Sequence, residues 1–194
     1  MSAQGGAGDR LYSISRRERV DRVMTSITVN EVKHRIAVRP HDVLLDVLRE
    51  QLNLTGSRRG CDMGTCGCCT VILDGRPVLS CLTLALEAEG LQVTTIEGIA
   101  HGEESGGLHP VQQAFVDQGA SQCGFCTPGF IMTAVSLLSK TANPSESEIR
   151  EAISGNMCRC TGYLSIIAAI QQAASVLRQR ASSSTGSAPA GTPR

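Results

Sequence analysis

Alternating β-branched and polar residues, which begin at Thr25, mark the start of the regularly patterned part of the chain. The alternation predicts two short strands, residues 26–29 and 34–38, around a turn at Asn30 and Glu31. The period then becomes helical, and Asp42 is expected to cap this helix. Its apolar face would hold Val43, Leu44, Val47, Leu48 and Leu52.

A loop rich in glycine and cysteine follows the predicted helix. Two further strands are expected after it, residues 70–73 before a turn at Asp74 and Gly75, and residues 91–95. A sheet crossed by one helix, with a cysteine-bearing loop after the helix, is typical of the ferredoxin-like β-grasp arrangement. The first half of the chain therefore predicts a unit of this kind.

The second half of the chain has a helical pattern. A glycine-rich stretch at 98–107 has no periodicity and is expected to be part of a linker. Helix starts are indicated by His109 with Pro110, by Thr127 with Pro128 as cap and first residue, and by a capping box of Ser145 and Glu148, and a last helix is expected over residues 163–178. Four helices predict a small four-helix bundle.

These patterns predict an α+β fold of two small domains with a polar segment at each end. The expected parts are an N-terminal extension (1–23), a plant-type ferredoxin-like domain (24–98), a linker (99–108), a helical domain (109–180) and a disordered tail (181–194), which is rich in Ser, Gly and Pro.

Composition narrows the possible functions. Aromatic residues are 3% of the 194 residues and Trp is absent, so the cores must be aliphatic and are expected to depend on cofactors. The 18 basic residues balance 18 acidic ones without a basic stripe, which disfavours nucleic-acid binding. The sequence shows no export signal and no apolar run of about 20 residues, so we expect a cytoplasmic protein without a membrane anchor.

Eight of the nine cysteines fall into two sets of four. The first set is Cys61, Cys66, Cys69 and Cys81, and the second set is Cys123, Cys126, Cys158 and Cys160. The first set has the C-x4-C-x2-C spacing with a distant fourth cysteine that is typical of plant-type 2Fe-2S clusters. Neither set has the C-x2-C-x2-C run that suits 4Fe-4S clusters, so the cysteines predict two 2Fe-2S centres and an electron carrier.

The loop of the first set also carries Gly60, Gly64 and Gly67, which are expected to let the backbone approach the cluster closely. Cys68 is the ninth cysteine and precedes Cys69. Adjacent residues of an extended loop point to opposite sides, so both cannot easily face one cluster, and the spacing selects Cys69. Cys68 is expected to be a small buried or turn residue.

In the second set, two cysteines of a helical turn face two cysteines of an extended segment, from which Arg159 would point outward. The positive end of the helix after Cys126 suits an anionic four-thiolate cluster. Zinc in a tetrahedral four-thiolate site is the alternative for this set. The chain has no G-x-G-x-x-G or Walker loop, so a flavin or nucleotide is expected on another chain.

Two motifs resemble the iron–sulfur subunit of the xanthine oxidase family of molybdenum hydroxylases. They read CDMGTCGCCTVILDGRPVLSCL, and QCGFCTPG followed by NMCRCTGY, and the resemblance covers about residues 25–178. The usual CGAC of the family is CGCC here, which adds Cys68 and leaves every expected ligand in place. The resemblance implies a β-grasp domain and a four-helix domain, each with one 2Fe-2S cluster.

The resemblance also implies partners. A large subunit would carry the molybdopterin cofactor and oxidise the substrate, a medium subunit would carry FAD, and the assembly would be a dimer of heterotrimers. Gln122 and Cys160 match family positions near the pterin, so the helical-domain cluster would lie next to molybdenum and the β-grasp cluster would face the flavin. The chain itself would supply no catalytic residue.

A free-standing two-cluster ferredoxin is the alternative from another class. It would be a monomer without stable partner subunits, and the balanced net charge of this chain offers no strong field to steer transient encounters. Within the family, a carbon monoxide dehydrogenase or a hydroxybenzoyl-CoA reductase-like enzyme fits the same motifs, because substrate contacts would lie in the large subunit.

Overall fold

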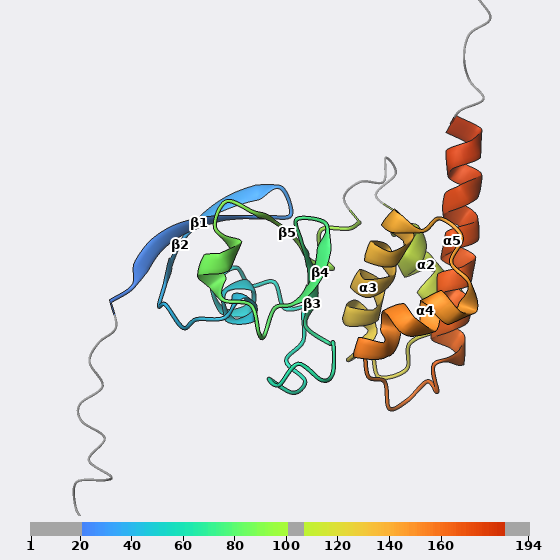
Figure 1. Cartoon of the computed structure of the whole chain (residues 1–194), viewed down its shortest axis with the longest axis horizontal. Coiled ribbons are helices and arrows are strands. Elements are labelled where there is room, and N and C mark those ends of the chain that lie inside the picture. The colour runs from blue at the N-terminus through green and yellow to red at the C-terminus, as the bar shows by residue number, and fades with distance from the viewer. Residues whose placement is uncertain (1–20, 101–106, 185–194) are drawn as a thin grey trace, which may run out of the picture.

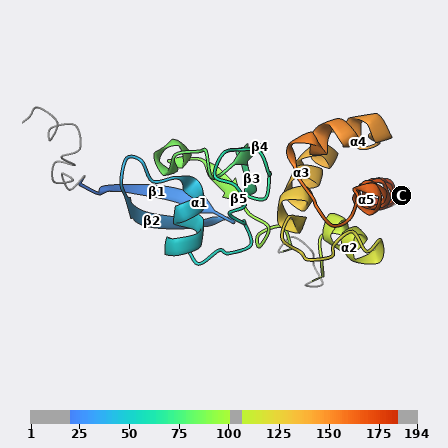
Figure 2. The ribbon, with the colours of Figure 1, turned by 90° about the horizontal axis from the view of Figure 1, so that it is seen from below.

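The chain forms two lobes that lie side by side in the computed structural model, which describes residues 21–100 and 107–184 (Figure 1). The first lobe is a sheet with a short helical segment against it, and the second lobe is built from helices. Helix α3 (Thr127–Lys140) is the part of the second lobe that faces the sheet (Figure 2). The expected α+β class is therefore confirmed.

Within the described residues, the sheet has five strands in the order β2-β1-β5-β3-β4. They are β1 (Val23–Val29), β2 (Val32–Val38), β3 (Thr70–Leu73), β4 (Arg76–Leu79) and β5 (Gln92–Thr94). Antiparallel hairpins join β1 to β2 and β3 to β4, and β5 lies between them, parallel to β1 and antiparallel to β3. The sequence did not predict β4, because its residues Arg-Pro-Val-Leu do not alternate.

Both hairpins turn where the sequence predicts. Asn30 and Glu31 have φ of 49° and 68°, and Asp74 and Gly75 have φ of 46° and 75°. Two successive residues with positive φ are typical of the tight turn whose twist matches that of the paired strands. The Asn30 side chain also accepts a hydrogen bond from the Thr95 N–H (2.9 Å), which ties the first hairpin to the end of β5.

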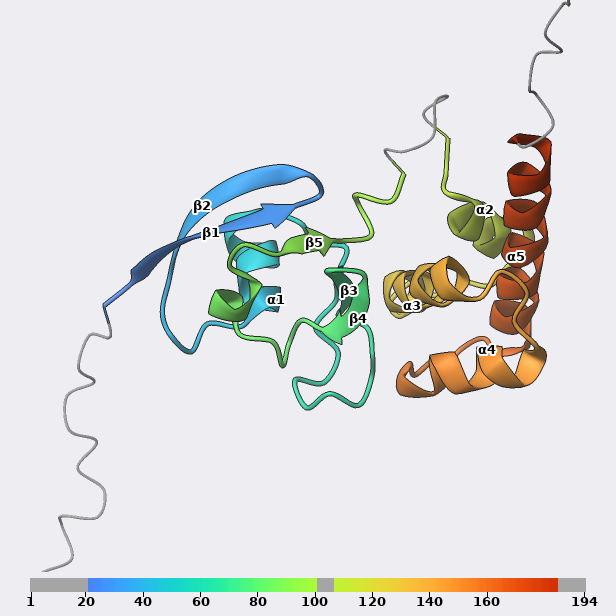
Figure 3. The same cartoon turned by 45° about the horizontal axis from the view of Figure 1, so that its top comes forward.

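A short 3-10 helix, η2 (Ala85–Ala88), contributes buried residues to the core of the sheet. A longer helical segment also packs against the sheet (Figure 3). It begins as α1 (Leu44–Asp46) and continues as a π-helix, η1 (Val47–Gln51), and its apolar side is buried as predicted. The expected cap is wrong: the Asp42 carboxylate accepts from the Arg39 N–H (2.8 Å) and pairs with the Arg39 side chain (3.2 Å). Asp42 therefore stabilises the turn before the helix, and Val43 occupies the cap position.

The helical lobe contains α2 (Pro110–Asp117), α3, α4 (Glu146–Ala152) and α5 (Leu164–Ser184). Phe130 is fully buried at its centre and meets the Tyr163 ring edge-on, with 5.9 Å between ring centroids. Two predicted helix starts are confirmed, because His109 accepts from the Val111 N–H (3.2 Å) and Ser145 and Glu148 form a capping box. No helix among the described residues is long and apolar enough to cross a membrane.

Several expected boundaries differ from the structure. Strand β1 begins at Val23 rather than at residue 26, β2 begins at Val32 rather than at residue 34, and β5 covers Gln92–Thr94 rather than 91–95. Thr127 is the first residue of α3 rather than its cap, because its hydroxyl donates to Ser121 (2.9 Å) and Cys126 takes the cap position. Helix α5 continues to Ser184, four residues into the expected tail, because the residues around Arg180 are good helix formers. Val23, which was expected in the N-terminal extension, belongs to β1 because it pairs with Val38. Residues 1–20 of the expected extension, residues 101–106 of the linker and residues 185–194 of the tail lie outside the described residues.

The two lobes meet where α3 packs against β3 and β4. Gly129 lies at the closest approach, since a side-chain carbon there would overlap the Gly67 carbonyl oxygen and lie 3.0 Å from the Cys68 Cα. The helix backbone therefore rests directly on the cysteine-bearing loop. This contact brings the two predicted cluster sites to neighbouring positions.

Candidate metal centres

The first set of cysteines gathers where the loop before β3 meets the segment after β4. Cys61, Cys66 and Cys69 come from the loop, and Cys81 follows β4. The thiols lie in two pairs, because Cys66 is close enough to Cys61 to affect its pKa, and Cys81 packs with Cys69. The structure thus brings together all four residues that the spacing predicted for this set.

Three glycines allow the path of this loop. Gly64 and Gly67 have φ of 77° and 67°, a left-handed backbone that side-chain-bearing residues rarely adopt. At Gly60, a side-chain carbon would lie 2.8 Å from the Cys66 sulfur. At Gly60 the backbone therefore comes close to a thiol, whereas a side-chain carbon would meet Leu82 at Gly64, and Asn156 and Gly155 at Gly67.

The thiols of the first set differ in how easily they ionise. The N–H of Met63, with help from the Thr65 hydroxyl, lowers the pKa of Cys61 to about 6. Burial, followed by the contact with Cys69, raises the pKa of Cys81 to about 12. A bound cation removes this obstacle, because a thiol that coordinates a metal is deprotonated outright.

The second set gathers at the beginning of α3. Cys126 is the cap residue of α3, Cys123 precedes it, and Cys158 and Cys160 lie between a short 3-10 turn, η3 (Ile153–Gly155), and α5. The sulfurs of Cys123 and Cys160 are 3.6 Å apart. Two thiolates on one tetrahedral metal at about 2.3 Å lie about 3.8 Å from each other. This pair therefore has the separation that a shared iron requires.

Cys126 and Cys158 form the second pair of this set. Burial, followed by the hydrogen bond that its thiol donates to Cys158, raises the pKa of Cys126 to about 12. Burial also opposes ionisation of Cys158, but the Thr161 hydroxyl (3.2 Å) and the Thr161 N–H (3.5 Å) outweigh it and lower the pKa of Cys158. The Cys158 thiol therefore ionises more easily than a free cysteine.

Each set has an outer and an inner pair. In the second set, Cys123 and Cys160 are exposed, whereas Cys126 is half-buried and Cys158 is buried. In the first set, Cys61 and Cys66 are half-buried and the other two cysteines are buried. Each site is therefore anchored in the protein on one side and open toward the surface on the other.

The donor sets suit two-iron clusters. Each set offers four thiols in two pairs, which matches a cluster in which each of two irons takes two thiolates. Soft thiolate ligands are the ones that iron–sulfur clusters use.

Cys68 is buried between the two sets. Its thiol points toward the Cys66 carbonyl (3.7 Å), and burial, followed by the contact with Cys66, raises its pKa to about 12. Cys126 of the other lobe is close enough to contribute to this shift. Cys69 instead packs with Cys81 and Leu45. The two neighbouring cysteines therefore face different surroundings, and the expected burial of Cys68 is confirmed.

Several polar residues around the second set support it. Gln122, which the sequence singled out, donates from its side-chain amide to the Cys160 carbonyl (3.2 Å). The Tyr163 hydroxyl accepts from the Cys158 N–H (3.0 Å), and the sequence reasoning missed this contact. It also missed Asn156 and Thr161. Tyr163, Asn156 and Thr161 each lie within three residues of a predicted ligand. This position is the signal that could have identified them, because residues beside metal ligands often orient those ligands.

Exposed apolar side chains surround both sites. Met63 and Leu82 are 69% and 57% exposed beside the first set. Phe125, Met157 and Leu164 are 42%, 57% and 71% exposed beside the second set. Large apolar side chains that cluster on a surface mark contacts with other proteins more often than chance.

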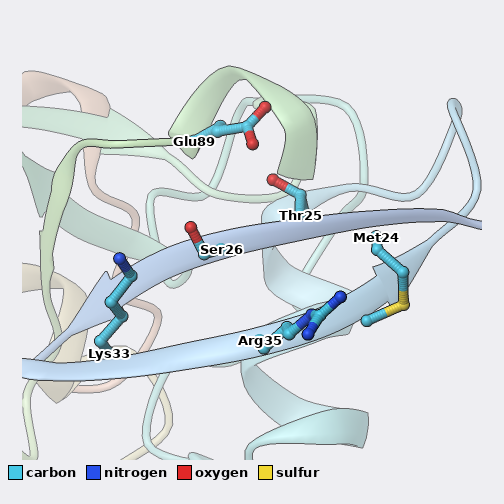
Figure 4. Close-up of a pocket in the computed structure, with 6 residues that line it drawn as sticks. All are labelled: Met24, Thr25, Ser26, Lys33, Arg35 and Glu89. Atoms are coloured by element: carbon cyan, nitrogen blue, oxygen red, sulfur yellow. The ribbon is translucent and has the colours of Figure 1, made fainter.

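A separate pocket lies on the β1–β2 hairpin and contains none of the cysteines. Its volume is about 500 Å³, and Figure 4 shows its lining residues, Met24, Thr25, Ser26, Lys33, Arg35 and Glu89. The Thr25 hydroxyl is buried there without a hydrogen-bond partner among the described residues.

Comparison with protein families divides the chain at the same place as the structure. Residues 27–93 match the model of a 2Fe-2S iron-sulfur cluster binding domain. Residues 95–171 match the model of a second domain, described as a 2Fe-2S binding domain. Each match contains one of the two cysteine sets.

Similar proteins and structures point in the same direction. The chain is 44% identical to the nicotine 6-hydroxylase small subunit of Paenarthrobacter nicotinovorans, over 79% of this chain and 90% of that protein. It is also 44% identical to the nicotinate dehydrogenase small FeS subunit of Eubacterium barkeri, over 79% of this chain and 96% of that protein. The crystal structure of quinoline 2-oxidoreductase from Pseudomonas putida 86 matches with a TM-score of 0.77 and 45% identity, covering 82% of this chain and 98% of the matched chain.

Proposed function

The chain belongs to the iron–sulfur subunits of the xanthine oxidase family of molybdenum hydroxylases, and we propose that the two sets of paired cysteines are its electron-transfer sites. It is the electron-transfer subunit of a heteromeric oxidoreductase and holds two 2Fe-2S clusters. The observation that carries the assignment of the sites is the pairing of eight thiols into two four-thiolate donor sets.

The proposed ligands of the two clusters are the eight cysteines of these sets. They are Cys61, Cys66, Cys69 and Cys81 for the first cluster, and Cys123, Cys126, Cys158 and Cys160 for the second. Each bound cluster accepts and releases one electron at a time. The surrounding N–H and hydroxyl groups, such as those of Thr161, donate to the ligand sulfurs and thereby set how readily each site takes an electron.

The complex carries molybdopterin with molybdenum, and FAD, on partner subunits. We propose a large molybdopterin-binding subunit, a medium FAD-binding subunit and a cytoplasmic dimer of heterotrimers. The exposed apolar side chains beside each site, among them Met63 and Leu164, support contacts with two partners. The proposed domain division is a β-grasp domain at 24–98, extended by Val23, a linker at 99–108, and a four-helix bundle at 109–180 whose last helix continues to Ser184.

The proposed order of transfer begins at the helical domain. Cys160 is an exposed outer ligand, and Gln122 donates to its carbonyl, so these two residues form the accessible edge of the second site. Electrons from the molybdenum centre would enter at this edge, cross the contact between the lobes and leave from the first set toward FAD. The glycines at 60, 64 and 67 are proposed to keep the first cluster loop closely packed.

The Cys160→Ser variant tests this order. We expect the complex to reduce molybdenum with substrate but to deliver electrons to the flavin about tenfold more slowly or worse, because a soft thiolate ligand is lost at the point of entry. The Cys66→Ser variant should leave the helical-domain cluster reducible by substrate and stall transfer on the flavin side. Paramagnetic resonance of freeze-quenched samples distinguishes the two centres.

Cys68→Ser is the matched control, because Cys68 is a buried neighbour of the ligands with its own thiol, and it should leave the order and the rate unchanged. If substrate reduced the first cluster at the normal rate while the helical-domain cluster was missing, the proposed order would be wrong.

A further inference from the structure

A backbone hydrogen bond connects the two cysteine sets. The Met157 N–H donates to the Cys66 carbonyl oxygen at 2.9 Å. Cys66 belongs to the first set, and Met157 is joined by a peptide bond to Cys158 of the second set. The backbone of one ligand thus reaches the backbone of a ligand in the other domain through one hydrogen bond and one peptide unit.

Asn156 holds the two loops at this point. Its side-chain amide donates to the Gly67 carbonyl oxygen at 3.0 Å, and its side-chain oxygen accepts from the Thr133 hydroxyl at 2.9 Å. The residue is 6% exposed, and both hydrogen bonds are buried. One side chain therefore ties the first cysteine loop to α3 and to the segment that carries Met157.

The fit around Asn156 is close. Gly67 has no side chain, and a carbon there would overlap the Asn156 amide and the Gly155 carbonyl oxygen. The Gly67 carbonyl also accepts a hydrogen bond from the Thr70 hydroxyl at 2.7 Å. The Asn156 amide therefore donates to a carbonyl whose position is already fixed by the first residue of β3. Only a side chain with both a donor and an acceptor can satisfy both neighbours, and a buried group that loses its partner is costly.

We propose that Asn156 is a positioning residue for transfer between the two clusters. By fixing the loops, it maintains the Met157–Cys66 hydrogen bond, which serves as the shortest bonded connection between the two ligand sets. This inference rests on the proposed function, since it concerns the step between the two sites. Asn156 does not act on the thiols directly. It acts by holding the backbone of Met157 in place.

The test uses the Asn156→Ala variant in the complete complex. We expect hydrogen exchange of the Met157 amide to accelerate about tenfold, because the buried hydrogen bonds of the Asn156 side chain to Gly67 and Thr133 are lost. We expect the magnetic interaction between the two reduced clusters to change, and transfer between them to slow several-fold at unchanged iron content. Asn156→Asp keeps the acceptor for Thr133 but lacks the donor for Gly67, so it should behave like the alanine variant.

Two further variants make the result specific. Thr133→Val leaves the Asn156 amide on Gly67 and removes only the hydroxyl that holds its oxygen, so it should shift the same quantities in the same direction but less. Ser145→Ala removes the capping box of α4, which lies outside the connection, and should leave Met157 exchange and the magnetic interaction unchanged. Unchanged Met157 exchange and cluster interaction in Asn156→Ala would overturn the proposal.

If the Asn156→Ala complex fails to assemble, the Thr133→Val variant tests the proposal instead. Wild-type values of Met157 amide exchange and of the magnetic interaction between the clusters in that variant would equally overturn the proposal. A wild-type complex without two distinct cluster signals would contradict the proposed function instead. The exchange of the Met157 amide is measured independently of those signals, so the two failures are distinguishable.

Discussion

Replacing Cys69 by alanine is expected to remove the first cluster, whereas replacing the adjacent Cys68 by alanine is expected to leave both clusters in place. The Cys69 side chain packs against Cys81 and belongs to a thiol pair. Cys68 is buried beside the Cys66 carbonyl and stands where the family motif has alanine, so its methyl-sized replacement fits. The two substitutions make the same chemical change one position apart.

Iron analysis of the purified complex measures this difference. Cys69→Ala should lower the iron content from about four to about two atoms per copy of the chain, and Cys68→Ala should keep about four. Equal loss in the two variants would show that the choice of ligand is wrong. Retention of all iron in Cys69→Ala with loss in Cys68→Ala would show that Cys68 is the ligand.

Replacing Gly129 by alanine is expected to destabilise the contact between the lobes. Alanine favours a helix over glycine by about 1 kcal/mol, so local propensity alone would predict stabilisation. The new side-chain carbon would overlap the Gly67 carbonyl oxygen and lie 3.0 Å from the Cys68 Cα, and both neighbours are backbone atoms of a cluster loop. Overpacking of this kind costs about 1–3 kcal/mol, and a rigid loop places the cost at the upper end.

Thermal unfolding of the complex, followed by the visible absorbance of the clusters, measures the net effect. We expect the midpoint for loss of the first cluster to fall by about 5 °C. Gly155→Ala is the matched control, because it adds the same carbon in the same lobe and nothing lies within 4 Å of it. A midpoint for Gly129→Ala at or above that of Gly155→Ala would contradict the account of the contact.

Local signals predicted much of the first lobe and of the ligand sets. The turns at 30–31 and 74–75 were predictable because their residue types tolerate positive φ between alternating strands. The cysteine spacing predicted which thiols gather, because loop ligands of one cluster must be close in sequence or joined by the sheet. These features depend on neighbours along the chain.

Features that depend on distant residues were not predictable in the same way. Asp42 and Thr127 are both good capping residues by type, but Arg39 and Ser121 bind their side chains. Strand β4 has no alternation and exists because β3 pairs with it. The clamp of Asn156 on Gly67 joins residues 89 positions apart, and no local pattern encodes that contact.

Metal, sulfide and spin analysis of the purified complex tests the central claim most directly. The account predicts about four irons and about four acid-labile sulfides per copy of this chain, and two distinct paramagnetic signals of about one spin each after reduction. Stoichiometric zinc in place of iron, or about two irons with a single signal, would contradict the claim that both cysteine sets hold 2Fe-2S clusters.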